Sequence, residues 1–200
     1  MVPPTRQRLI EAANHRFYRD GFRGVGIDQI LDDVGISKTA FYKHFESKED
    51  LVLEVLRHHD RWWRDAFRRM VRQRGGDTAL GQLKALMDVV AEVIESDEYR
   101  GCFFVNVSME FPLPHDPAHV AAAESKRSIE EFVRDLATQA GAADPAALAE
   151  DLCLVMEGAY VTQQVACGNR TARIARRIGE RLIAAYVPGA GAAENSIGRA

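Results

Sequence analysis

Residues 27–45 read IDQILDDVGISKTAFYKHF, and this stretch decides the fold of the N-terminal part of the chain. Four apolar residues recur at helical spacing and predict the inner face of a short helix: Ile27, Ile30, Leu31 and Val34. Gly35 follows and allows a sharp turn, because glycine adopts backbone angles that other residues avoid. Ser37 is a good N-cap, so a second helix is expected over residues 38–45. The stretch therefore predicts two short helices set at a steep angle.

The second of these helices has one apolar and one polar side. Ile36, Ala40, Phe41 and Phe45 return to the small core. The outward side consists of residues that donate hydrogen bonds: Ser37, Lys38, Thr39, Tyr42, Lys43 and His44. The major groove of DNA accepts one helix, so this side is suited to reading base edges. The alternative is a three-helix packing unit without a role in DNA binding, in which Tyr42 and Phe45 belong to the core.

The run VGISKTAFYKHFESKEDLVLEVL, residues 34–56, resembles the helix-turn-helix and the start of the fourth helix in the tetracycline-repressor (TetR) family. Upstream, IEAA at residues 10–13 and the segment from Phe17 to Phe22 are similar to the family's first helix. Farther along, residues 101–106, 116–117 and 141–145 resemble the regulatory regions of some members. The resemblance implies an all-α fold of about nine helices: a three-helix DNA-binding domain, followed by a helical domain for ligand binding and dimerisation.

Position by position, the resemblance implies that Lys38 and Thr39 face base edges. Tyr42 and His44 match positions that usually contact phosphates, and Lys43 fits either role. Lys48, at the start of the fourth helix, matches another phosphate anchor, which the helix dipole favours. One departure is Gly26, where the family often has a threonine that contacts phosphate. The backbone N–H of Gly26 can still be offered there, although the side-chain contact is lost.

Charge is divided unevenly along the chain. Residues 1–74 carry 15 basic and 11 acidic groups, whereas the whole chain has a formal net charge of −3. A positive end suits phosphate contacts, although unequal halves also arise by chance. Charged residues interrupt the N-terminal segment, so we expect no signal-peptide core in it. No apolar run approaches the roughly 18 residues of a membrane helix. Three widely spaced cysteines argue against a disulfide framework. We therefore expect a cytoplasmic protein.

The remaining segments also have helical periodicity. The expected domains are residues 1–47, residues 48–187, and a disordered tail over 188–200. A first helix is expected to contain Leu9, Ala12, Ala13 and Phe17 on one face and to end at Asp20. Further helices are expected over residues 48–74, 78–96, 101–111, 117–140, 145–167 and 171–187. Gly141 and Gly168 are the expected stops after two of them.

The last two helices are apolar enough to predict a homodimer through a four-helix seam. The expected interface residues are Leu148, Leu152, Val155, Ala159, Ile174, Ile178 and Leu182. The alternative is that these side chains pack within one chain. A dimer suits a palindromic operator, since its two helix-turn-helix units then read two half-sites.

The resemblance also implies a cavity among the middle helices for a small effector. Aromatic and apolar candidates with a few polar anchors are Trp62, Trp63, Phe67, Met87, Cys102, Phe103, Asn106, Val107, Glu110, Tyr160 and Gln164. Most such side chains simply belong to a core, and the abundance of aromatic ones favours a lipophilic or aromatic effector. Cys102 is either a reactive thiol at a helix N-terminus or a buried small apolar residue.

Two other classes of protein are an enzyme and a helical adaptor. The chain contains no nucleophile elbow, phosphate-binding glycine loop or HExxH motif, so we expect neither an enzyme nor a metal or cofactor. A helical adaptor for another protein would make the Lys38–Thr39–Tyr42 surface incidental, and it would not bind duplex DNA. The favoured reading is a DNA-binding repressor that an effector releases from its operator. The sequence alone does not distinguish repression from activation or give the operator.

Overall fold

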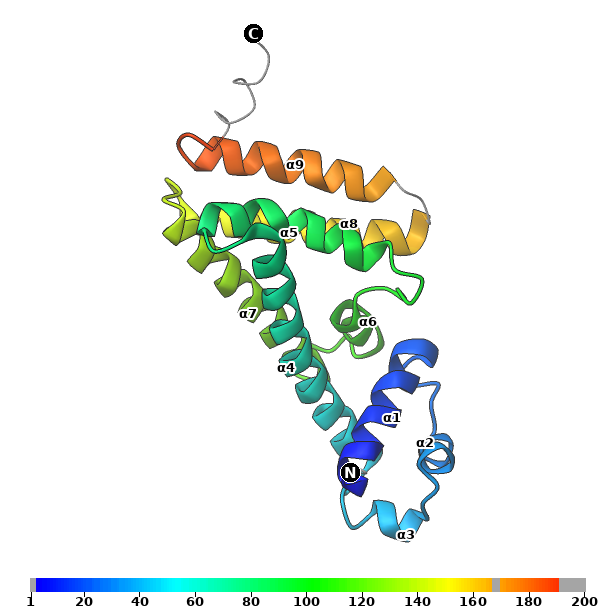
Figure 1. Cartoon of the computed structure of the whole chain (residues 1–200). Coiled ribbons are helices and arrows are strands. Elements are labelled where there is room, and N and C mark those ends of the chain that lie inside the picture. The colour runs from blue at the N-terminus through cyan, green and yellow to red at the C-terminus, as the bar shows by residue number, and fades with distance from the viewer. Residues whose placement is uncertain (1–2, 167–169, 191–200) are drawn as a thin grey trace. The chain divides into compact units, whose positions relative to one another are not determined.

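The computed structural model describes residues 3–166 and 170–190. Within these residues the chain is all-helical and without strands, which confirms the predicted fold class (Figure 1). The described helices are α1 (Thr5–Asp20), α2 (Ile27–Val34), α3 (Lys38–Phe41), α4 (Lys48–Gly75), α5 (Ala79–Ile94), α6 (Phe103–Glu110), α7 (Pro117–Gln139), α8 (Pro145–Ala166) and α9 (Arg170–Tyr186). None of these helices is long and apolar enough to cross a membrane.

The chain folds into two compact units that are not contiguous in sequence. The first contains Met1–Arg64 and Cys102–Lys126, and the second contains Asp65–Gly101 and Arg127–Ala200. The domain boundary expected after residue 47 thus falls inside the first unit. The reason is that Leu51, Val55 and Leu56 of α4 join the same core as α1, α2 and α3. Phe103, Phe104 and Val107 of α6 join it as well.

The core of the first unit is built from one side of each short helix. In α1, the side chains of Leu9, Ile10, Ala13 and Phe17 are buried. Phe17 stacks on Phe22, with ring centroids 5.0 Å apart, and Phe22 meets Phe103 edge to face at 5.3 Å. Burying one such side chain contributes about 1.5–3 kcal/mol relative to leaving it in water. Helices this short therefore hold their place through tertiary packing.

Helix α3 is shorter than the expected 38–45, because the chain tightens after Phe41. The His44 N–H donates to the Phe41 carbonyl oxygen at 2.8 Å, a bond that spans three residues instead of four. Tyr42, Lys43 and His44 therefore lie in turns. The Phe45 N–H still donates to the same carbonyl at 3.1 Å.

In the second unit, α5, α8 and α9 pack together. Helices α9 and α5 lie close together at Gly179, where an added Cβ would lie 2.6 Å from Met87 Cγ. The Arg176 Nε donates to Asp88 at 2.7 Å, and the Tyr186 hydroxyl donates to Asp151 at 2.9 Å. A glycine and two polar bonds thus fix α9 against its neighbours.

The last helix ends at Tyr186, next to the expected end at Val187, and the residues after it contact the second unit. Lys84 Nζ donates to the carbonyl oxygen of Ala190 at 2.9 Å, and Ala190 is buried. The first residues of the expected tail thus contact the second unit at Ala190, whereas residues 191–200 lie outside the described residues. Cys167 and Gly168, the expected end of the preceding helix, also lie outside them.

His59, on α4, is a titratable group inside the first unit. Its ring stacks on Phe103 with centroids 3.8 Å apart, and its Nδ1 lies 3.0 Å from Asn14 Oδ1. Burial, together with the smaller effect of the neighbouring His58, lowers the pKa of His59 to about 3. The imidazole is therefore neutral in the folded protein at physiological pH.

This burial makes stability depend on pH. Between the ordinary histidine pKa near 6.5 and about 3, the unfolded chain binds a proton at His59 that the folded chain does not. The free energy of unfolding should therefore fall by up to about 2 kcal/mol from pH 7 to pH 5, at about 1.36 kcal/mol per pKa unit. Urea unfolding of the wild type and His59→Gln at several pH values measures this. A variant that keeps the full wild-type slope would refute the assignment to His59.

Candidate nucleic-acid interface

The turn before α3 has the geometry that its sequence predicts. Gly35 lies in the left-handed region, with φ 71° and ψ 43°, and its N–H donates to the Leu31 carbonyl oxygen at 2.8 Å. The hydroxyl of Ser37 accepts a hydrogen bond from the Ala40 N–H at 3.2 Å, so the predicted N-cap is confirmed. Together these bonds fix where α3 begins and in which direction it leaves α2.

The outward side of α3 and of the turn behind it is open to solvent. Ser37, Lys38, Thr39, Tyr42, Lys43 and His44 are all exposed. Tyr42 has 56% of its surface exposed, which excludes the interpretation that it belongs to the core. Phe41 and Phe45 are 0% and 2% exposed and hold the opposite side down. The segment thus offers six polar side chains from one anchored support.

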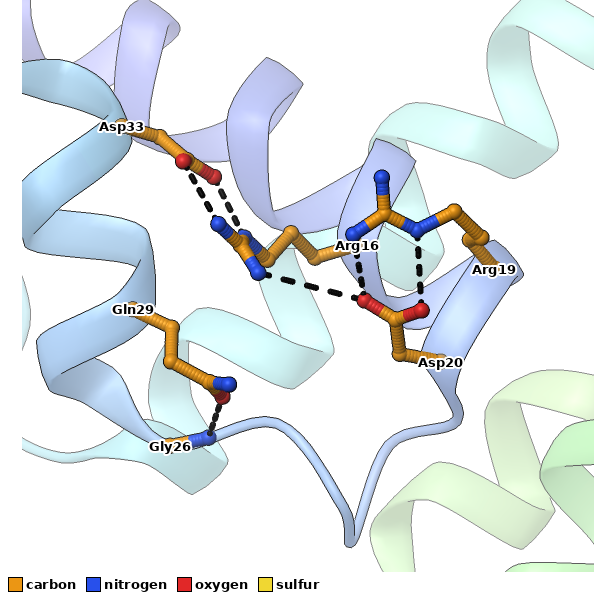
Figure 2. A network of polar contacts seen from close by, with 6 residues as sticks. All are labelled: Arg16, Arg19, Asp20, Gly26, Gln29 and Asp33. Atoms are coloured by element: carbon orange, nitrogen blue, oxygen red, sulfur yellow. Dashed lines mark hydrogen bonds and ion pairs between the residues drawn. The ribbon is translucent and has the colours of Figure 1, made fainter.

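Two further expected contacts lie beside this surface. Lys48 is the first residue of α4 and half-buried, and its Nζ lies 6.0 Å from the centre of the Phe17 ring. Gly26 is the N-cap of α2, but its N–H donates to Gln29 Oε1 at 2.8 Å, as Figure 2 shows. The N–H of Gly26 is therefore not free to meet a phosphate unless Gln29 releases it, which corrects the expectation from sequence.

A pair of charged residues, which the sequence did not single out, joins α1 to α2. Arg16 contacts both oxygens of Asp33, with Nε to Oδ2 at 2.5 Å and Nη2 to Oδ1 at 2.6 Å (Figure 2). The hydrogen bond from Arg16 lowers the pKa of Asp33, and the same bond raises the pKa of Arg16. Exposed ion pairs stabilise a fold only slightly, so this one links the two helices but contributes little to the free energy of folding.

Glu110, at the end of α6, accepts two hydrogen bonds from the loop between α1 and α2. Its Oε1 accepts from the Phe22 N–H at 2.9 Å, and its Oε2 accepts from the Arg23 N–H at 2.7 Å. The guanidinium of Arg23 also lies 5.7 Å from the centre of the Phe111 ring. Glu110 was expected to anchor an effector, but its carboxylate is already occupied by this loop.

The other effector candidates do not gather in one unit. Trp62, Trp63, Cys102, Phe103, Asn106 and Val107 belong to the first unit, whereas Phe67, Met87, Tyr160 and Gln164 belong to the second. Phe67, Met87, Phe103, Val107 and Tyr160 are buried among their neighbours, as core residues are. Trp62 is 54% exposed. The Sγ of Cys102, which is half-buried, lies 3.0 Å from Lys126 Nζ.

The apolar surface of α8 differs from the expected dimer interface. Leu148, Leu152 and Ala159 are buried within their own unit, and Val155, Ile174, Ile178 and Leu182 are half-buried. The exposed positions instead form a stripe at helical spacing, which we call the α8 stripe: Leu154, Gly158, Val161 and Val165. Because α8 is apolar on most sides, periodicity alone could not tell which side faces its own chain.

Comparison with known proteins agrees with this geometry. Residues 9–55 match the model of bacterial regulatory proteins of the tetR family, and residues 79–178 match the tetracyclin repressor-like C-terminal domain. The chain belongs to the tetR family. It is therefore a transcriptional regulator with a DNA-binding helix-turn-helix, and not an enzyme.

Relatives of this tetR-family regulator extend over most of its length. The chain is 24% identical over 163 residues to the HTH-type transcriptional regulator YjdC of Escherichia coli K12, covering 82% of this chain and 85% of YjdC. It is 29% identical over 131 residues to the repressor DhaR of Mycobacterium sp. strain GP1, covering 66% and 63%. The crystal structure of the TetR-family regulator SCO4454 from Streptomyces coelicolor superposes with a TM-score of 0.80 at 29% identity, covering 90% and 94%.

The two hydrogen bonds that Glu110 accepts from the loop can be tested by substitution. Glu110→Ala leaves two backbone N–H groups without their acceptor, so we expect a loss of about 1–3 kcal/mol in stability and faster amide exchange at Phe22 and Arg23. Glu110→Gln keeps one carbonyl acceptor and should fall between Ala and wild type. Met109→Ala is the control, since Met109 is 77% exposed. Unchanged exchange at both amides in Glu110→Ala would contradict the contact.

Proposed function

We propose that this regulator binds a palindromic operator as a homodimer, placing residues 37–44 of each subunit in the major groove. The observation that carries the proposal is the exposed polar side of α3 above the buried Phe41 and Phe45. One helix fits the major groove, where base edges differ in their donors and acceptors. Lys38 and Thr39 lie at the first two positions of α3 and are assigned to base edges.

Phosphate contacts are assigned to the groups around these two residues. Tyr42, His44 and Lys48 take that role, and Lys43 serves either. The first unit carries 12 basic and 13 acidic residues, so it has no overall positive charge. Seven of the 12 arginines in residues 1–74 lie at 57–74, on α4, away from α3 in sequence. Attraction to DNA must therefore come from these few local contacts, and a moderate dependence on salt follows.

Selection of bound duplexes from a random pool tests this function. We expect a palindromic consensus with half-sites about one helical turn, or a multiple of it, apart. Tyr42→Ala should weaken binding on every sequence, because it removes a phosphate contact. Lys38→Ala or Thr39→Ala should change the preferred base. Equal losses on all sequences for all three variants would contradict the assignment, and no binding to any duplex at low salt would refute the function.

Dimerisation is assigned to the α8 stripe together with the half-buried side of α9. Leu154 is 73% exposed and Val165 is 80% exposed. A contiguous apolar stripe in contact with water is unfavourable and marks an interaction surface. The small Gly158 between Leu154 and Val165 would let a second helix approach closely. A second copy of the chain would cover the same stripe on both subunits through a two-fold axis.

Leu154→Glu tests the dimer interface without opening the core. Two carboxylates brought together across a two-fold axis repel, so we expect sedimentation as a monomer and at least about tenfold weaker binding to the palindrome. Leu113→Glu, at a residue 56% exposed in the first unit, is the control and should remain dimeric. A Leu154→Glu protein that stays dimeric would exclude this surface.

We further propose that the regulator represses and that a small lipophilic or aromatic effector releases it. A dimer on a promoter blocks polymerase directly, although relatives include proteins named as a repressor and as an activator. An effector that favours the unbound conformation lowers operator affinity by a coupling of about 1–3 kcal/mol. Titrating the operator complex with aromatic compounds measures this release. If transcription rises with added regulator, the protein activates and the proposal of repression is wrong.

A further inference from the structure

The base-reading end of α3 is tied to α2 by an ion pair. Lys38 Nζ lies 2.9 Å from Asp28 Oδ1 and 3.1 Å from Asp28 Oδ2. Lys38 is the first residue of α3, and Asp28 is the second residue of α2. The hydrogen bond that Lys38 donates to Asp28 raises the pKa of Lys38, and the nearby Tyr42 adds to this. Helices α2 and α3 of the helix-turn-helix thus meet at the ammonium group of Lys38.

Both side chains are exposed, with 61% for Lys38 and 71% for Asp28, so the pair contributes little to folding stability. The pair instead restricts where the ammonium group of Lys38 lies. A free lysine is a flexible point charge that finds the nearest phosphate. An ammonium that meets both oxygens of one carboxylate keeps at least one of its three N–H donors for another acceptor.

The position of the carboxylate also matters for docking. Asp28 lies in the first turn of α2, where a negative charge is favoured by the helix dipole but repelled by the DNA backbone. Phosphates are thereby kept from Lys38 on the side where Asp28 lies. The acceptors left for the spare N–H are those of base edges, and lysine most often reads guanine O6 and N7.

We propose that Asp28 is a positioning residue that directs Lys38 to a guanine in each half-site. This inference rests on the proposed function and extends it, because it assigns specificity to a residue outside α3. Without Asp28 the lysine reaches neighbouring phosphates, so base preference is lost while general affinity rises.

The test compares selections from a random duplex pool for wild type, Asp28→Asn, Lys38→Ala and the double variant. Asp32→Asn is the matched control, since Asp32 is also an exposed aspartate of α2 and the substitution changes charge equally. We expect Asp28→Asn to lose preference for guanine at one position of the half-site by roughly tenfold. Both Asn variants should bind random duplex more tightly than wild type.

Three outcomes separate the possibilities. Retained guanine preference in Asp32→Asn, and no further change when Asp28→Asn is added to Lys38→Ala, support the positioning role. If Asp28→Asn keeps the wild-type consensus, the inference is wrong although the regulator binds its operator. If the wild type selects no duplex, the proposed function itself fails. Thermal unfolding of Asp28→Asn should match wild type, which a purely structural role would not predict.

Discussion

The helix-turn-helix, residues 27–45, depends on the burial of Phe41 and Phe45. A helix of four residues does not persist in water by itself, so α3 exists only because its apolar side is held in a core. Phe41 packs against the Phe45 ring at 5.6 Å, and the left-handed turn at Gly35 aims the helix. The polar side chains between them face solvent as a consequence of this anchoring.

The supports of α3 come from distant parts of the sequence. Arg16 on α1 pairs with Asp33 on α2, and Glu110 on α6 accepts hydrogen bonds from the loop that precedes α2. All of these residues belong to one compact unit, which α6 completes. A change at α6 would therefore act on the helix-turn-helix through a carboxylate and two backbone N–H groups, without requiring a change in α3 itself.

Local features of the sequence predicted local structure well. Glycine and proline positions, capping side chains and apolar periodicity placed the helices within a few residues, and the polar side of α3 was identified from residues 37–44. Contacts between distant residues were out of reach, because no local pattern relates Arg16 to Asp33 or Glu110 to Phe22. Periodicity also failed on α8, where Leu148 and Leu154 are equally apolar but only Leu154 is exposed.

Amide hydrogen exchange of the protein with and without its selected duplex tests directly whether α3 enters the major groove. If α3 enters the groove, backbone amides from residue 37 to residue 44 should become protected, together with the amide of Lys48, while the α8 stripe changes little within an existing dimer. Tight binding that leaves the 37–44 amides exchanging as in the free protein would contradict the account, because another surface would then hold the DNA.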